Sequence, residues 1–245
     1  MCARLGPCRG YKTKIVLPTC AIVPAFDAAA TVGRVIDDLR EALDVGVIVV
    51  DDGSTDSTGY IAAGHGAQVV RHERNLGKGA AILSGLREAV AQGIRLAVTV
   101  DADGQHPASS ARRILEGCAD PRTLVLGVRN LLRDGAPRSN RFGNWTSNLF
   151  LSVFSGRRLH DTQCGLRRYP VVETLALGTR SLGYAFEAEV LLRATAAKLP
   201  LIEVPIDVIY PSDGERRSHF HNVRDPIRIV AAVARTALEL RLHAR

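Results

Sequence analysis

Short apolar runs without polar alternation recur through the first half of this chain, and longer amphipathic stretches separate them. The runs cover residues 19–26, 45–52, 67–72, 94–103 and 123–129. Runs of this kind are typical of strands buried on both faces, and such strands occur in parallel sheets that carry helices on each side. The pattern predicts an α/β fold, a three-layer sandwich with a mostly parallel central sheet.

Helical periodicity and end signals place helices between these strands and after them. We expect helices at 28–43, from a cap at Ser54 or Thr55 to residue 63, at 77–93, from near Pro107, at 184–198 and from about 223. A further strand is expected at 199–210. No repeat or low-complexity linker interrupts the chain, so we predict one domain over 19–221. Residues 1–18 are predicted to form a disordered extension, and residues 222–245 a basic amphipathic helix.

The charge of the chain is informative only where it is clustered. The net charge is +7, with 32 basic against 25 acidic residues, and only four of the basic residues are lysines. We discount this overall excess and expect no nucleic-acid partner. From Arg129 to Arg168, however, eight arginines face only Asp134 and Asp161. We predict that this segment lies near an anionic ligand or surface.

The five cysteines are scattered and odd in number, and none belongs to a CxxC pair. This distribution favours a reducing, cytoplasmic setting. The N-terminus lacks an apolar stretch of signal-peptide length, and no run reaches the roughly 18 residues of a spanning helix. We therefore expect a cytoplasmic protein that is soluble or lies peripherally on the inner face of the cell membrane.

Aspartates end two of the predicted strands. Asp51 and Asp52 end one, and Asp101 and Asp103 end another. Ligands of open parallel sheets gather at the carboxyl ends of strands, and paired carboxylates can hold a hard divalent cation there. Because buried anions without a cation are costly, Asp101 and Asp103 predict a Mg²⁺ or Mn²⁺ site. For Asp56 we prefer the alternative, that the side chain only caps the following helix or turn.

Lys78 lies between two glycines in the segment NLGKGAA, at the start of a predicted helix. A phosphate could approach the bare backbone of such a segment. The pattern is not the GxxxxGK[ST] of nucleoside triphosphatases, and a flexible helix entry would explain it as well.

Seven segments in order along the chain carry a family resemblance. They are VPAFDAAATVGRVI, VVDDGSTDSTG, NLGKGAAILSGL, VDADGQHP, GVR, DTQCGLRRY and GYAFEAEVLLRA. In order and spacing they resemble the motifs of family 2 glycosyltransferases with the GT-A (Rossmann-like) fold, above all dolichyl-phosphate mannosyltransferases and bacterial polyprenyl-phosphate sugar synthases. The resemblance covers about residues 19–220. It implies an inverting, metal-dependent transfer of a sugar from a nucleoside diphosphate to a polyprenyl or dolichyl phosphate, with 19–221 as the catalytic domain.

The resemblance also implies roles for individual residues. The implied nucleotide-binding residues are Pro24, Phe26, Asp27, Val50, Asp52, Lys78, Asp101 and Ala102. The implied metal ligands are Asp101, Asp103 and Gln105, and the implied acceptor-phosphate contacts are Arg138, Arg141, Arg217 and His219. The implied catalytic residues are Asp103, Arg129, Arg141 and Glu189, with Arg129 at the donor phosphate.

The chain departs from the family pattern at two places. The family usually reads Pro-x-Tyr-Asn-Glu where this chain has Pro24, Ala25, Phe26, Asp27 and Ala28. The acidic contact to the base is therefore absent, and the nucleotide is either GDP or UDP. A lysine common in a late loop of the family corresponds here to His219 or, by a shifted alignment, to Arg217.

The chemistry of the acceptor distinguishes two kinds of transfer. A phosphate monoester is already ionised and needs no general base, so the Arg-rich segment favours a lipid phosphate. A hydroxyl acceptor, as in polysaccharide or natural-product assembly, needs a carboxylate, for which Asp161, Glu187 and Glu189 are candidates. Of the two glutamates we expect Glu189 to lie near the site and to orient an arginine. His106 and His160 are expected to have only structural roles in loops.

Two other functions compete with sugar transfer, and the last helix has two possible roles. A haloacid-dehalogenase-like phosphatase also ends a strand in Asp-x-Asp, but on its first strand and before a threonine, whereas Gln105 follows here. A phospho-receiver module would leave the second half of the chain without a role. The helix at 222–245 could lie on an anionic membrane or simply pack on the domain.

Overall fold

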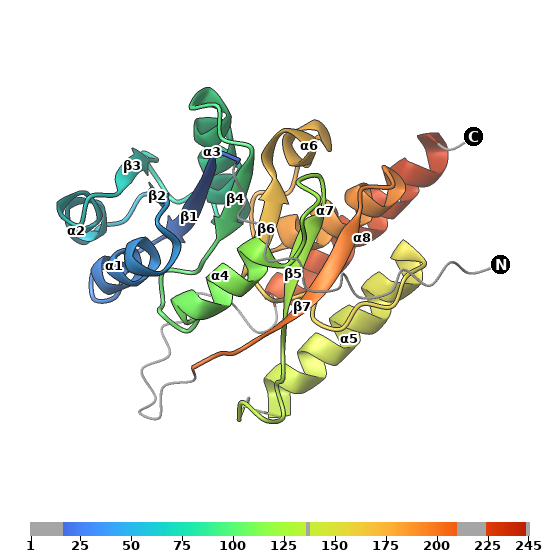
Figure 1. Ribbon diagram of the computed structural model, residues 1–245. Helices are drawn as coiled ribbons and strands as arrows, with labels where there is room; N and C mark the ends of the chain where they lie inside the picture. The colour runs from blue at the N-terminus through green and yellow to red at the C-terminus, as the bar shows by residue number, and fades with distance from the viewer. Residues whose placement is uncertain (1–16, 136–137, 210–223, 244–245) are drawn as a thin grey trace.

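The computed structural model describes residues 17–135, 138–209 and 224–243, which form one seven-stranded sheet with helices on both faces (Figure 1). The strands are β1 (Thr19–Ala25), β2 (Gly46–Asp51), β3 (Gln68–Arg71), β4 (Leu96–Thr99), β5 (Leu124–Arg129), β6 (Arg167–Pro170) and β7 (Leu201–Ile206). The helices are α1 (Val32–Leu43), α2 (Thr58–Gly64), α3 (Lys78–Ala91), α4 (Ala108–Glu116), α5 (Arg138–Ser155), α6 (Val171–Ala176), α7 (Ala185–Ala196) and α8 (Arg224–His243). Every predicted strand and helix is present, which confirms the α/β class.

The strand order is β3-β2-β1-β4-β6-β5-β7. All the pairings are parallel except those of β6, which runs antiparallel to both β4 and β5. The sheet is therefore mostly parallel, as predicted. Strand β6 itself was not predicted, because its sequence, RRYP, carries two charges where a buried strand is expected to be apolar.

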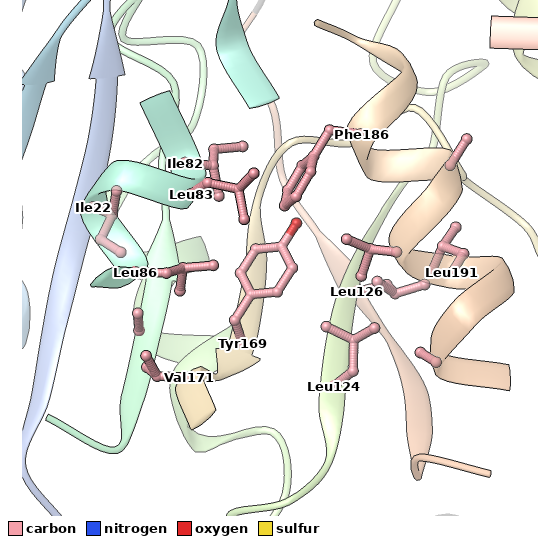
Figure 2. Close-up of a cluster of buried hydrophobic side chains, with 14 of the residues drawn as sticks. Ile22, Ile82, Leu83, Leu86, Leu124, Leu126, Tyr169, Val171, Phe186 and Leu191 are labelled. Atoms are coloured by element: carbon pink, nitrogen blue, oxygen red, sulfur yellow. The ribbon is translucent and has the colours of Figure 1, made fainter. Parts of the chain in front are cut away.

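Each face of the sheet has its own hydrophobic core, which explains the absence of polar alternation. Along β1, Ile22 belongs to one core cluster and Val23 to the other. Helices α3 and α7 cover the first face, and α1 and α4 cover the second. In Figure 2, Tyr169 of β6 lies between Leu86 of α3 and Leu126 of β5, with its hydroxyl toward Phe186 of α7. The three-layer prediction is confirmed.

Two of the clustered arginines have structural roles. Arg167 and Arg168 are fully buried in β6. The Arg167 guanidinium donates to the carbonyls of Cys164, Thr162 and Glu187, and that of Arg168 to the carbonyls of Leu115, Cys118, Asp120 and Thr123. The prediction that the whole segment faces an anion is therefore wrong for these two residues, whose charges are satisfied by main-chain oxygens.

Helix α2 begins later than predicted. Ser54 and Thr55 do not cap it, because both contact Asp27: Ser54 Oγ accepts from the Asp27 amide at 3.0 Å, and the Thr55 amide donates to Asp27 Oδ1 at 2.8 Å. Asp56 instead accepts from the amide of Thr58, the first residue of α2, at 2.9 Å. Asp56 therefore stabilises the turn before α2, in line with the preferred interpretation, but its Oδ2 also accepts from the amide of Ala29 at 3.1 Å, so this is not its only contact.

Helix α8 packs on the domain. Ala232, Val233 and Thr236 are buried, and Glu239 pairs with Arg193 of α7 at 2.8 Å. This supports packing, rather than membrane contact, as the role of the last helix. None of the helices in the described ranges is long and apolar enough to cross a membrane. The predicted disorder of the N-terminal extension lies, for residues 1–16, outside the described part of the chain.

Candidate active site

The acidic strand ends meet at one edge of the sheet, because β2 and β4 both flank β1 in parallel. Strand β2 ends at Asp51, and Asp101 lies two residues beyond the end of β4. The amide of Val100 still donates to the carbonyl of Ile22 at 3.0 Å, so the chain follows β1 for one more residue before it turns. The predicted convergence of the aspartates at this edge is what the structure shows.

The two aspartates at the end of β2 form hydrogen bonds with other residues of the chain. Asp51 Oδ1 accepts from the amide of Ser54 at 2.9 Å. Asp52, 3% exposed, accepts from the amides of Leu76 and Gly77 at 3.0 and 2.8 Å, and lies 2.6 Å from Nδ1 of His72. Asp52 therefore fixes the loop that leads into α3, a role that the sequence did not indicate. A contact with the nucleotide stays a prediction for this residue.

The nucleotide-binding residues predicted near β1 and β2 fall into two groups. Pro24, Phe26 and Asp27 are half-buried at the end of β1. Val50, by contrast, is fully buried and belongs to the core on the α3 face. Its side chain packs inside the sheet, so the predicted contact of Val50 with the nucleotide would have to use main-chain atoms and stays a prediction.

Asp101 is paired with a lysine. Nζ of Lys78, the first residue of α3, lies 2.7 Å from Asp101 Oδ1 and 3.2 Å from Oε1 of Glu187 on α7. Burial favours the neutral amine, but the two carboxylates outweigh it and raise the pKa of Lys78 above its ordinary value. Burial also opposes ionisation of Asp101, but Lys78 outweighs it and holds the pKa of Asp101 below its ordinary value. The lysine is therefore an ammonium held between two carboxylates.

Glu187, and not Glu189, is the glutamate of α7 that lies at this site. Glu189 is buried and accepts from the amides of Arg180 and Ser181 and, at 2.7 Å, from Nε of Arg193. The expectation that Glu189 orients an arginine is confirmed, but its expected place beside the acidic strand ends is wrong. Residues two apart on a helix point in different directions, and it is Glu187 that points at Lys78.

Asp103 lies exposed beside this pair. Its Oδ1 accepts from the amide of Gln105 at 3.0 Å, and the carbonyl of Ala102 accepts from the Thr31 hydroxyl at 2.6 Å. Partial desolvation and the neighbouring Asp101 carboxylate raise the pKa of Asp103 to about 6. A carboxylate whose ionised form is disfavoured in this way is suited to receive a cation.

The donor atoms at this edge fit a hard divalent cation. Asp101, Asp103 and Gln105 offer oxygen ligands, which Mg²⁺ and Mn²⁺ prefer. Within the described ranges, no three His, Cys, Asp or Glu side chains form a metal site of their own. The arrangement therefore suits a cation that takes its remaining ligands from water and from a phosphate group.

Arg129, at the end of β5, is held by Asp161. Its Nε lies 2.7 Å from Asp161 Oδ2, its Nη2 lies 2.9 Å from Oδ1, and its amide donates to Oδ2 at 3.1 Å. Asp161 is buried, whereas the Arg129 side chain is 18% exposed. The sequence indicated Asp161 only as a candidate base, but the structure uses it to orient Arg129.

His160 and His106, both expected to have structural roles in loops, differ in their surroundings. Nδ1 of His160 lies 2.7 Å from Glu203, so its expected structural role is confirmed. His106 follows Gln105, and its Nδ1 is buried without a hydrogen-bond partner in the structure. Burial lowers the pKa of His106 to about 4 and keeps the ring neutral. No pattern in the sequence indicates that this ring is buried beside the acidic edge.

The residues predicted at the acceptor phosphate are only partly described. Arg141 lies half-buried on α5. Arg138 begins the same helix, but its side chain lies outside the described part of the chain, as do Arg217 and His219 altogether.

A titration can test the electrostatics at Asp103. The pKa of about 6 is above that of an unfolded aspartate, so folding favours the protonated form between the two values. Ionisation of this carboxyl should therefore reduce stability as the pH rises from about 4 to about 6. We expect carbon NMR of the carboxyl groups to show one aspartate, absent from Asp103→Asn, with a midpoint near 6. A midpoint near 4 would contradict this description of the site.

Comparisons with known proteins identify relatives of both sequence and fold. The family model described as "Glycosyl transferase family 2" matches residues 20–169. The chain is 28% identical over 212 residues to a UDP-N-acetylglucosamine--dolichyl-phosphate N-acetylglucosaminyltransferase of Methanococcus voltae, with 77% of this chain and 84% of that protein covered. It is 28% identical over 232 residues to a polyprenol monophosphomannose synthase of Mycolicibacterium smegmatis, with coverages of 87% and 85%.

A similar solved structure is that of the glucosyl-3-phosphoglycerate synthase of Mycobacterium tuberculosis. It aligns with a TM-score of 0.73 at 20% identity and covers 91% of this chain and 81% of its own. The same synthase has also been crystallised with Mn²⁺, UDP-glucose and phosphoglyceric acid, and that complex aligns with a TM-score of 0.70 at 19% identity, covering 91% and 80%. At this level of identity the likeness establishes the fold, which is GT-A.

Proposed function

This chain belongs to glycosyl transferase family 2, and we propose that it transfers a sugar from a UDP- or GDP-linked donor to a polyprenyl phosphate, with inversion at the anomeric carbon. The relatives of Methanococcus and Mycolicibacterium support the acceptor class by their names. The donor class is supported by the nucleotide sugar bound to the structurally similar synthase.

Asp101, Asp103 and Gln105 would hold a Mg²⁺ or Mn²⁺ ion, which when bound neutralises charge on the diphosphate leaving group. Arg129 is well placed to add to this, because Asp161 fixes its guanidinium plane before substrate arrives. In this proposal Arg129 would be a preorganised positive group near the negative charge that develops as the sugar–phosphate bond breaks.

The choice of a phosphate acceptor rests on one observation, namely that all three candidate bases are already in ion pairs. Asp161 is paired with Arg129, Glu187 with Lys78, and Glu189 with Arg193, and all three carboxylates are buried. A carboxylate in a buried ion pair is a poor proton acceptor. An ionised phosphate acceptor does not need one, and attack by its oxygen from the face opposite the nucleotide gives inversion.

The direct experiment offers the purified protein a panel of UDP- and GDP-sugars with Mn²⁺ or Mg²⁺ and two acceptors. The first is a short polyprenyl phosphate and the second is phosphoglyceric acid, the molecule bound to the structurally similar synthase. We expect a glycolipid product that still carries one phosphate. Transfer only to phosphoglyceric acid would establish the second candidate, a soluble hydroxyl acceptor, and reject the lipid.

We further propose that α5 meets the membrane that holds such an acceptor. Trp145, Leu149 and Val153 follow each other at intervals of four residues and are 60%, 53% and 70% exposed. Residues at this spacing form one stripe along a helix. The half-buried Arg141 precedes the stripe by one turn and supplies the positive charge that anionic lipids attract. These observations support α5 as the surface that meets the membrane.

Vesicle binding tests this surface. The double variant Trp145→Ser, Leu149→Ser should bind vesicles of anionic phospholipid about tenfold or more weakly than the wild type, because it removes most of the apolar stripe. Tyr60, which is 84% exposed on α2, provides the matched control as Tyr60→Ser and should bind like the wild type. Co-sedimentation measures both. Equal losses in the two variants would contradict a role for α5.

A further inference from the structure

The ammonium of Lys78 forms an ion pair with Asp101, a carboxylate that the proposed metal would need as a ligand. It lies 2.7 Å from Asp101 Oδ1 and neutralises that group, while its own side chain is only 17% exposed. A divalent cation at Asp101 would lie beside this positive charge in a poorly solvated place, where repulsion is strong. Lysine and metal therefore compete for the same carboxylate.

Lys78 is not at this place to stabilise its helix. It is the first residue of α3, where the positive end of the helix dipole disfavours a cation. Instead, the absence of a side chain at Gly165 leaves room for the Lys78 ammonium. A Cβ on Gly165 would lie 2.5 Å from Lys78 Nζ and 2.7 Å from Asp101 Oδ2. The Gly165 carbonyl in turn accepts from the Thr99 hydroxyl of β4 at 2.7 Å, which fixes this close approach.

Glu187 provides a second carboxylate close to the same ammonium. Glu187 Oε1 is 3.2 Å from Nζ, is buried, and has no hydrogen-bond partner in the structure. A buried carboxylate oxygen without a hydrogen bond is costly, so it would gain from a closer lysine. A short movement of Nζ from Asp101 toward Glu187 would satisfy this oxygen and free Asp101 without exposing a charge.

We propose that Lys78 is a counter-ion that exchanges partners, bound to Asp101 before the metal arrives and to Glu187 afterwards, with Glu187 as the positioning residue. The inference rests on the proposed metal site at Asp101 and Asp103. Lys78 keeps its proton throughout, and only its partner changes. In the free protein the lysine keeps Asp101 compensated, and on loading Glu187 lowers the cost of releasing it.

Mn²⁺ binding without nucleotide tests the exchange, read from the electron paramagnetic resonance signal of free Mn²⁺ with the full chain near neutral pH. Lys78→Met should bind Mn²⁺ about tenfold more tightly, because the competitor is gone. Glu187→Gln should bind it about tenfold more weakly, because the lysine has lost its alternative partner. The double variant should match Lys78→Met alone, since Glu187 acts only through the lysine.

Controls separate this inference from the metal site itself. Glu88→Gln removes a half-buried charge from the same helix, one that contacts Gln68 and not the acidic strand ends, and should leave the affinity unchanged. Lys78→Arg should retain most of the competition. Asp103→Ala should lose Mn²⁺ binding if the proposed site is correct. If Asp103→Ala does lose Mn²⁺ binding, two results would overturn the exchange alone. One is unchanged or weaker Mn²⁺ binding by Lys78→Met, and the other is an equal effect of Glu187→Gln in the presence and in the absence of Lys78.

Absence of Mn²⁺ binding by the wild type would reject both the exchange and the metal site. If Glu187→Gln fails to fold by circular dichroism, the comparison of Lys78→Met with Lys78→Arg decides the question.

Discussion

Replacing Asp103 by alanine is expected to lower sugar transfer by a factor on the order of 10²–10³ or more, without unfolding the protein. Asp103 is exposed, and its side chain accepts one hydrogen bond in the structure, from the amide of Gln105 at 3.0 Å. Little packing is lost with it. What is lost is one of two carboxylates in the proposed metal site, and with it the compensation of charge on the leaving diphosphate.

The chain offers a matched control for this variant. Asp120 Oδ1 accepts from the amide of Arg122 at 2.9 Å, in the same i to i+2 arrangement, within a turn between α4 and β5. Asp120 Oδ2 also accepts from the Thr123 hydroxyl at 3.1 Å, so Asp120→Ala should cost at least as much in stability as Asp103→Ala and should still retain transfer. Initial rates with saturating donor and Mn²⁺, together with thermal unfolding, measure both variants. Transfer by Asp103→Ala within about threefold of the wild type would remove the metal site from the mechanism, since even one lost stabilising group costs about 10².

The sequence predicts those strands and helices whose signals lie within a single segment of the chain. The five apolar runs of the first half each became a strand, and Gly93 closes α3 with a φ of +73°. Strand β6 could not be found in this way, because Arg167 and Arg168 resemble an anion-binding pair. Their guanidinium groups are satisfied by carbonyls from segments up to 53 residues away, and no local pattern reports such contacts.

In the candidate site, too, local signals are predictable from the sequence and long-range contacts are not. The positions of Asp101 and Asp103 follow from strand ends, which local pattern predicts well. The ion pairs around them do not: Lys78 of α3 pairs with Asp101, Glu187 of α7 pairs with Lys78, and Asp161 of the loop before β6 pairs with Arg129. Choosing between Glu187 and Glu189 requires the rotation of α7 about its axis, which is set by packing against the sheet and not by the spacing of the two residues.

The pair formed by Arg129 and Asp161 should combine a large effect on stability with a large effect on catalysis. Arg129→Ala leaves Asp161 buried and without its guanidinium, which we expect to lower the free energy of unfolding by about 3–5 kcal/mol. Transfer should fall by a factor on the order of 10²–10³ as well, because the variant lacks the charge that we propose to face the donor phosphate. Urea unfolding measures the first effect and initial rates the second.

A double variant separates the two effects. Replacing both members of a buried ion pair by apolar residues of similar size is often neutral for stability, whereas removing one member is not. Arg129→Met, Asp161→Leu should therefore recover most of the unfolding free energy lost in Arg129→Ala, although the Arg129 amide loses its acceptor at 3.1 Å. Transfer should not recover, because the positive charge is still missing. If the double variant regained activity together with stability, Arg129 would be a structural residue, and the stabilisation of the leaving diphosphate would rest on the metal site alone.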